Sequence, residues 1–219
     1  MLYRESLWIK SAVNLIGNEL KNLNIINLGS STSEFIATKQ PYIQTNVINV
    51  LNSIGNVVSV DIKKEHGVDL VANFLTKEGQ EIIKNKHPKL VMASNLLEHL
   101  PDPLIGLQEI AGLLDSGGFL LLTGPTWYPY HPDPIDNNFR PSIRTIKKLL
   151  GGKYKVTKID SVFGGSVLTC TSANKSEAYK WFFSQINLRE IRRNPRGFGA
   201  MIRNSLYPVR AYCALLQKI

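Results

Sequence analysis

The chain has 219 residues, of which 43% are hydrophobic and 20% are charged, and its formal net charge is +9. This length suits one α/β domain with a modest appendage, and the composition is typical of a globular protein with a real core. No run approaches the ~18 apolar residues of a membrane span, so no membrane-spanning helix is expected in this sequence.

The positive charge is concentrated near the C-terminus. Residues 175–219 hold nine Lys and Arg residues and two acidic residues, which gives a net charge of +7. The rest of the chain holds 17 Lys and Arg residues and 15 acidic residues, which gives a net charge of +2. Such a segment can bind phosphate, nucleic acid or an anionic membrane surface. A solvated basic helix is the simpler interpretation.

Two features indicate a cytoplasmic protein. Arg4, Glu5 and Lys10 interrupt the apolar pattern at the N-terminus, so we expect no secretory signal. Cys170 and Cys213 lack the spacing of a metal site, and we expect both to be free thiols in a reducing compartment.

The first third of the chain alternates between predicted helices and strands. Residues 3–20 have apolar side chains at helical spacing, which predicts an amphipathic helix that packs on a sheet. A short apolar strand over 24–28 leads into Gly29-Ser30-Ser31-Thr32-Ser33. The next predicted elements are a helix over 45–54, a strand over 57–60 that ends at Asp61, a strand over 68–72, and a helix over 76–86.

The segment from Lys89 to Pro125 predicts a strand, a helix and a second strand. Residues 90–93 and 119–122 are short apolar runs, and residues 104–114 have apolar side chains at helical spacing. Because neither strand alternates with polar residues, we expect a parallel sheet that is covered on both faces.

The C-terminal half begins with an irregular stretch. Residues 126–142 are too polar and Pro-rich for regular structure, and they follow a strand's carboxyl end, where open α/β sheets bind ligands. A helix is predicted over 143–150, and strands over 154–159 and 166–171. Residues 175–219 are predicted to form a basic helical extension of a domain that spans residues 1–174.

Two segments carry a resemblance to a known family. The first segment begins with N-L-L-E-H-L-P-D-P over residues 95–103 and continues with a predicted helix, Gly-Gly and F-L-L-L-T-G-P. This order resembles the central segment of class I S-adenosylmethionine-dependent methyltransferases of the type 11-like kind. H-P-D-P-I-D and F-R-P-S within residues 131–142 resemble a loop of a subset of these enzymes. The likeness covers about residues 24–172. It implies a Rossmann-like three-layer α/β sandwich with a mostly parallel sheet of about seven strands, closed by an antiparallel pair over 154–171.

The resemblance implies S-adenosylmethionine as the cofactor, held first by the loop after the first strand. The family usually has an acidic residue and three glycines here, whereas this chain has Asn27, Gly29, Ser31 and Ser33. Serines are small and can donate hydrogen bonds to a carboxylate, so Gly29, Ser30 and Ser31 are expected to cradle the methionine part. An ordinary Ser-rich turn that caps a helix is the alternative.

Asp61 and its neighbour Ile62 are expected at the cofactor's ribose. The separation of Asp61 from Gly29 is about that of a β-α-β nucleotide-binding unit, and one carboxylate accepts hydrogen bonds from both ribose hydroxyls. The alternative is that Asp61 caps the next turn.

The remaining cofactor contacts are implied by position. Asn73 can pair with the adenine and Phe74 can pack on the base, although core packing is an equal alternative for Phe74. Asn95 and Leu96 stand at a strand's carboxyl end and are expected beside the methionine part.

The loop over residues 126–142 is expected to meet the methyl acceptor. His131 is the candidate general base because its unperturbed pKa lies near neutrality, and Asp133 or Asp136 would orient it. The expected substrate-binding residues are Trp127, Tyr130, Asp133 and Arg140. The alternative is that His131 and the aspartates cap turns and that Arg140 pairs with one of them.

We expect no metal, although His131, Asp133 and Asp136 are suitable ligand types. Glu98 and His99 are expected to be structural residues at a helix entry.

The sequence therefore predicts a methyltransferase that acts on a small molecule, sugar or glycolipid precursor by in-line methyl transfer. A methyltransferase-like binding or scaffold protein without catalysis is the alternative, suggested by the serines in the glycine loop. No Asn-Pro-Pro-Tyr sequence of base-methylating enzymes is present, so no specific nucleic acid partner is expected. The basic segment is the candidate contact with a membrane surface or with a second copy of the chain.

Overall fold

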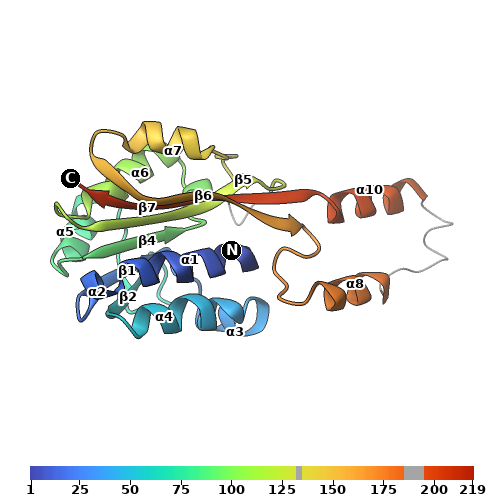
Figure 1. The fold of residues 1–219 in the computed structure, drawn as a ribbon, viewed down its shortest axis with the longest axis horizontal. Coiled ribbons are helices and arrows are strands. Elements are labelled where there is room, and N and C mark those ends of the chain that lie inside the picture. The colour runs from blue at the N-terminus through green and yellow to red at the C-terminus, as the bar shows by residue number, and fades with distance from the viewer. Residues whose placement is uncertain (132–134, 185–194) are drawn as a thin grey trace.

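A computed structural model describes residues 1–131, 135–184 and 195–219 of the chain. Its centre is a seven-stranded sheet with the strand order β3-β2-β1-β4-β5-β7-β6 (Figure 1). The strands are β1 (Asn24–Leu28), β2 (Asn56–Asp61), β3 (Leu70–Val71), β4 (Leu90–Ser94), β5 (Phe119–Trp127), β6 (Tyr154–Ser166) and β7 (Pro208–Lys218). Only β7 runs antiparallel to its neighbours, which confirms the predicted mostly parallel α/β sheet.

Helices cover both faces of this sheet (Figure 1). One layer contains α1 (Tyr3–Leu15), α2 (Gly17–Leu20), α3 (Ser33–Lys39), the π-helical turn η1 (Gln44–Ile48) and α4 (Asn49–Asn52). The opposite layer contains α5 (Lys77–Lys84), the 3-10 turn η2 (Leu97–His99), α6 (Pro103–Gly112) and α7 (Ile143–Leu150).

The central strands are apolar on both sides because each side meets a helical layer. Successive residues of a strand point to opposite faces. Accordingly, Leu90 and Met92 of β4 pack with α1, whereas Val91 and Ala93 pack with the α6 layer. This burial explains why the strands read as continuous apolar runs in the sequence.

The C-terminal region differs from the prediction. Residues 208–218 form β7, which lies inside the sheet between β5 and β6, and residues 167–171 form turns instead of a strand. The predicted helical extension is therefore wrong over residues 208–218. The predicted domain boundary at residue 174 falls within an insertion between β6 and β7.

The burial of β7 on both faces explains the error. Val209, Ala211, Cys213 and Leu215 pack on the α1 side, and Tyr212, Ala214 and Leu216 pack on the other side. Such a run lacks the period-two alternation of a half-exposed strand, and its apolar positions also fit a helix.

The insertion between β6 and β7 carries α8 (Lys175–Ser184) and α10 (Pro195–Ser205), which project beyond the end of the sheet (Figure 1). Across the described residues, no helix has both the length and the apolar character needed to cross a membrane. Cys170 and Cys213 are buried free thiols, as expected.

Candidate functional site

A cavity of about 500 Å³ opens at the carboxyl ends of the parallel strands. Its wall includes Asn27 and Gly29 from the end of β1, Asp61 from β2, Ser94 from β4 and Pro125 from β5. The chain leaves β1 toward β2 on one side and later returns to place β4 on the other. The cavity therefore lies where the strand order reverses, which is the usual ligand position in open α/β sheets.

The loop after β1 forms one wall of the cavity. Gly29 has a φ of +68°, and a Cβ added there would lie 2.7 Å from Cδ1 of Leu96. The positive φ favours glycine, and an added Cβ would displace the side chain of Leu96. The neighbouring Ser30 and Ser31 also line the cavity, and the buried hydroxyl of Ser30 has no hydrogen-bond partner among the described residues. A ligand can therefore use this hydroxyl.

Asp61 stands at the rim of the same cavity. Its Oδ1 accepts a hydrogen bond of 3.0 Å from the backbone N–H of Lys63, and no described residue donates to its Oδ2. The carboxylate can therefore accept further hydrogen bonds. The structure places Ile62 away from the cavity, with 63% of its surface exposed, because its side chain points outward next to the rim.

The structure does not bring the two predicted adenine contacts into the cavity wall. Oδ1 of Asn73 accepts a hydrogen bond of 3.0 Å from the N–H of Leu75, in the turn before α5. Phe74 is buried in the core beneath that helix, where the apolar ring packs better than in an open cavity. Val68 lies in the cavity wall instead.

Asn95 and Leu96, the predicted neighbours of the methionine part, line the cavity at the end of β4. Asn95 has a φ of +51°, and its side-chain amide donates a hydrogen bond of 2.8 Å to Oε1 of Glu5 on α1. The second oxygen of Glu5 accepts a hydrogen bond of 2.9 Å from the N–H of Leu2. Glu5 is fully buried and is not among the predicted site residues, although an acidic residue on the apolar face of a helix is a signal for such a role.

His131 lines the cavity at its other end, beside Tyr128. Its backbone N–H donates to Oδ2 of Asp136 at 2.9 Å, and its Nδ1 lies 3.2 Å from the same oxygen. The same Nδ1 lies 3.1 Å from the carbonyl oxygen of Pro129, so this carbonyl and Asp136 together hold the imidazole. Burial lowers the pKa of His131 below its usual value, which favours the neutral ring at pH 7.

Arg140, a predicted substrate-binding residue, pairs with Asp136 and is not in the cavity wall. Its guanidinium donates a hydrogen bond of 2.6 Å to Oδ2 of Asp136. Burial alone would raise the pKa of Asp136, but this bond and the backbone N–H groups of His131 and Asn138 lower it to about 2.

The other predicted substrate residues are not in the wall of the cavity. Trp127 and Tyr130 are 52% and 63% exposed, because the strand end and the following loop turn these side chains outward. Trp127 instead stacks against the guanidinium of Arg210. Asp133 lies outside the described residues.

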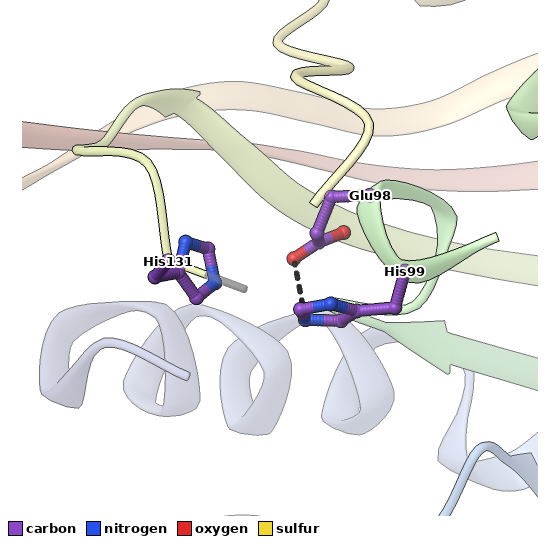
Figure 2. Close-up of side chains that lie close together, drawn as sticks. All are labelled: Glu98, His99 and His131. Atoms are coloured by element: carbon purple, nitrogen blue, oxygen red, sulfur yellow. Dashed lines mark ion pairs between the residues drawn. The ribbon is translucent and has the colours of Figure 1, made fainter. Parts of the chain in front are cut away.

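Glu98 and His99 also line the cavity, contrary to the expectation that they are only structural. Glu98 is 1% exposed, and neither of its carboxylate oxygens has a hydrogen-bond partner among the described residues. Burial raises the pKa of this carboxyl to about 7. Figure 2 shows Glu98 between His99, whose Nε2 is 4.0 Å away, and His131.

The comparisons with known proteins give matches among solved structures only. No family model matches the chain, and a search of curated proteins also finds no match. A proposed sarcosine dimethylglycine methyltransferase from Galdieria sulphuraria superposes with a TM-score of 0.58 at 14% identity, over 98% of this chain and 85% of that one.

Two further structures are similar to this chain. A methyltransferase structure from Bacillus halodurans C-125 gives a TM-score of 0.54 at 12% identity, over 95% of this chain and 97% of that one. Coclaurine N-methyltransferase, bound to N-methylheliamine and S-adenosylhomocysteine, gives a TM-score of 0.54 at 15% identity, over 97% of this chain and 70% of that one. At such low identities the similarity establishes the architecture. The chain therefore has the fold of the class I S-adenosylmethionine-dependent methyltransferases.

Proposed function

We propose that this protein is an S-adenosylmethionine-dependent methyltransferase that acts on a small-molecule acceptor. One observation carries the proposal: a single cavity joins the loop after β1, Asp61 and Asn95 to a pair of proton-accepting groups, His131 and Glu98. A cofactor site and a site for acid–base chemistry therefore share one space.

The residues present fit the cofactor. The cavity volume lies within the range of about 300–1,000 Å³ that is typical of small-molecule sites. Gly29 allows close approach of a ligand, Ser30 offers an unpartnered hydroxyl, and Asp61 offers a carboxylate oxygen for the ribose. When bound, S-adenosylmethionine supplies an electrophilic methyl group. Similar structures hold S-adenosylhomocysteine or, in a Haemonchus contortus enzyme of which this chain covers 52%, S-adenosylmethionine.

The residues of the chain would prepare the acceptor. A neutral His131, held at Nδ1 by the carbonyl of Pro129 and by Asp136, can take a proton from an acceptor hydroxyl at its Nε2. Met1 and Leu2 lie over the same cavity, and the hydroxyl of Tyr42 fixes Met1 by donating to its carbonyl at 2.6 Å. This cover would exclude water from the reacting groups.

A hydroxyl-bearing acceptor fits this arrangement best. A sugar, a glycolipid precursor or another small alcohol is therefore the acceptor class that we propose. We propose no specific nucleic acid partner.

The insertion that carries α8 and α10 contains seven Lys and Arg residues and two acidic residues over 175–207. We propose that this basic insertion is the part of the chain that would contact an anionic membrane surface or a second copy of the chain.

The test is release of S-adenosylhomocysteine in the presence of sugars, glycolipid precursors, phenols and amines, presented as separate pools. We expect turnover with a hydroxyl-bearing pool and at least a hundredfold loss in His131→Ala, while the surface variant His87→Asn retains activity. Cofactor binding without turnover in any pool would favour the non-catalytic alternative.

A further inference from the structure

The turn η2 and the loop after β5 bring three metal-ligating side chains together at the acceptor end of the cavity. One ligand atom from each of Glu98, His99 and His131 lies within 4.8 Å of the other two, and Figure 2 shows the side chains converging. We propose that these three residues bind a divalent transition-metal cation of the zinc, iron or manganese kind.

The first argument is the condition of Glu98. Its carboxylate is buried and lacks hydrogen-bond partners among the described residues, whereas the neighbouring buried carboxylates Glu5 and Asp136 accept two and three hydrogen bonds. A buried carboxylate is normally paired or coordinated to a metal. Arg140 is already bound to Asp136, and the only ion-pair partner of Glu98 among the described residues is the imidazole of His99, whose Nε2 lies 4.0 Å from Oε1.

The second argument is the orientation of the two imidazoles. Nδ1 of His99 lies 2.6 Å from the carbonyl oxygen of Ile135, and Nδ1 of His131 lies 3.1 Å from that of Pro129. Because a carbonyl oxygen only accepts hydrogen bonds, both Nδ1 atoms carry the proton. Each Nε2 then has a free lone pair, and this is how proteins hold histidine ligands of metals.

The third argument is the ligand set. Two histidines and one carboxylate, with remaining positions open, bind zinc in hydrolases and iron in oxygenases, whereas magnesium and calcium prefer oxygen ligands. Ligand atoms around tetrahedral zinc are about 3.3 Å apart, so binding would draw the side chains together by up to about 1.5 Å. Small side-chain rotations, for example of the partly exposed His131, can supply this movement.

A metal ion bound at this site would activate the methyl acceptor. All three residues line the cavity, so a bound ion would lower the pKa of an acceptor hydroxyl there. Nε2 of His131 would then be a ligand of the ion and would not act as the general base. This role of the ion rests on the proposed function, but binding of the ion itself does not.

The test is calorimetric titration of the full chain, stripped of metal with EDTA and desalted, with Zn²⁺ in the absence of cofactor. We expect one ion per chain and at least tenfold weaker binding in each of Glu98→Gln, His99→Ala and His131→Ala. The matched control is His66→Ala/His87→Asn, which removes the other two histidines and keeps wild-type affinity. Bound Co²⁺ should show visible absorption that Glu98→Gln loses.

Several outcomes would overturn the site. These are unchanged Zn²⁺ affinity in Glu98→Gln, loss of binding in the surface control, tighter binding of Mg²⁺ than of Zn²⁺, or no binding of Zn²⁺, Mn²⁺ or Co²⁺ by folded wild-type protein. In the last case, protonated amine ligands would test whether Glu98 pairs with a substrate cation. If Glu98→Gln fails to fold, the two histidine variants decide. Cofactor affinity measured on the same samples keeps failure of the metal site distinct from failure of the proposed function.

Discussion

The side-chain amide of Asn95 donates a 2.8 Å hydrogen bond to Oε1 of Glu5, which lies 90 residues earlier in the chain. Asn95 ends β4 in a left-handed conformation, and Glu5 is fully buried in the first turn of α1. This contact fixes the helix that precedes the sheet to the edge of the proposed cofactor cavity. The helix is therefore anchored to the cavity wall as well as packed on the sheet.

Replacing Glu5 with Ala should lower both stability and cofactor affinity. The substitution leaves the amide of Asn95 and the N–H of Leu2 without their acceptor, which should cost about 2 kcal/mol in the free energy of unfolding. Urea denaturation measures this change. Glu19→Ala, on an exposed position of α2, is the control and should change stability by less than about 0.5 kcal/mol. Equal effects of the two variants would contradict the role of Glu5.

Gly29→Ala should weaken cofactor binding more than it weakens the fold. The new methyl group would push Leu96 toward the cavity, in addition to the strain of a positive φ. Gly152→Ala is the matched control, because Gly152 also has a positive φ (+82°) but no atom lies within 4 Å of its added Cβ. Both variants should lose about 1 kcal/mol of stability. Only Gly29→Ala should lose affinity for S-adenosylhomocysteine, and normal affinity in that variant would place the cofactor elsewhere.

Glu98 should make the metal-free protein less stable as the pH rises. Burial raises the pKa of its carboxyl in the folded state to about 7, above the value of 4.5 in the unfolded chain. Its contribution to stability is therefore fully present below about pH 4.5 and is lost as the pH rises through 7. In EDTA, wild type should lose about 2 to 3 kcal/mol between pH 5 and 8 relative to Glu98→Gln. Exposed Glu78→Gln should follow wild type, and a flat wild-type profile would argue against an unpaired carboxyl.

Asp136 should have the opposite effect on stability. Its folded-state pKa is about 2, below the unfolded value of 3.8, so its contribution is present above about pH 4 and is lost as the pH falls through 2. Asp136→Asn should lose about 2 kcal/mol at pH 7, and the difference from wild type should shrink by about half at pH 3. Urea unfolding at both pH values measures this difference in the free energy of unfolding, and Asp115→Asn, at an exposed position, is the control. A constant difference at both pH values would exclude the ion pair with Arg140 as its source.

Local patterns in the sequence predicted the centre of the fold. The apolar runs at 90–93 and 119–122 and the helical spacing between them correspond to β4, β5 and α6. The loop at Gly29 and the strand ends at Asp61 and Asn95 were predicted to meet, and the structure places them around one cavity. These features were predictable because each depends on residues that are neighbours in the chain or in adjacent strands.

Features that depend on distant parts of the chain were not predictable in this way. The segment of β7 predicts a helix because both of its faces are buried and its apolar positions fit a helix. For Phe74 the sequence leaves cofactor contact and core packing equally open, and the structure places it in the core beneath α5. The partner of Glu5 lies 90 residues away, and the environment of Glu98 is made by a loop about 35 residues later. Spacing within one segment carries no information about such contacts.

Calorimetric titration of the purified chain with S-adenosylmethionine, beside Asp61→Ala and the control Asp115→Ala, tests the central claim most directly. We predict micromolar binding of one cofactor per chain to wild type and to the control, and at least tenfold weaker binding to Asp61→Ala, because the ribose hydroxyls lose their acceptor. Absence of binding to the folded wild-type protein, or equal binding to Asp61→Ala, would contradict the assignment of this cavity to the cofactor.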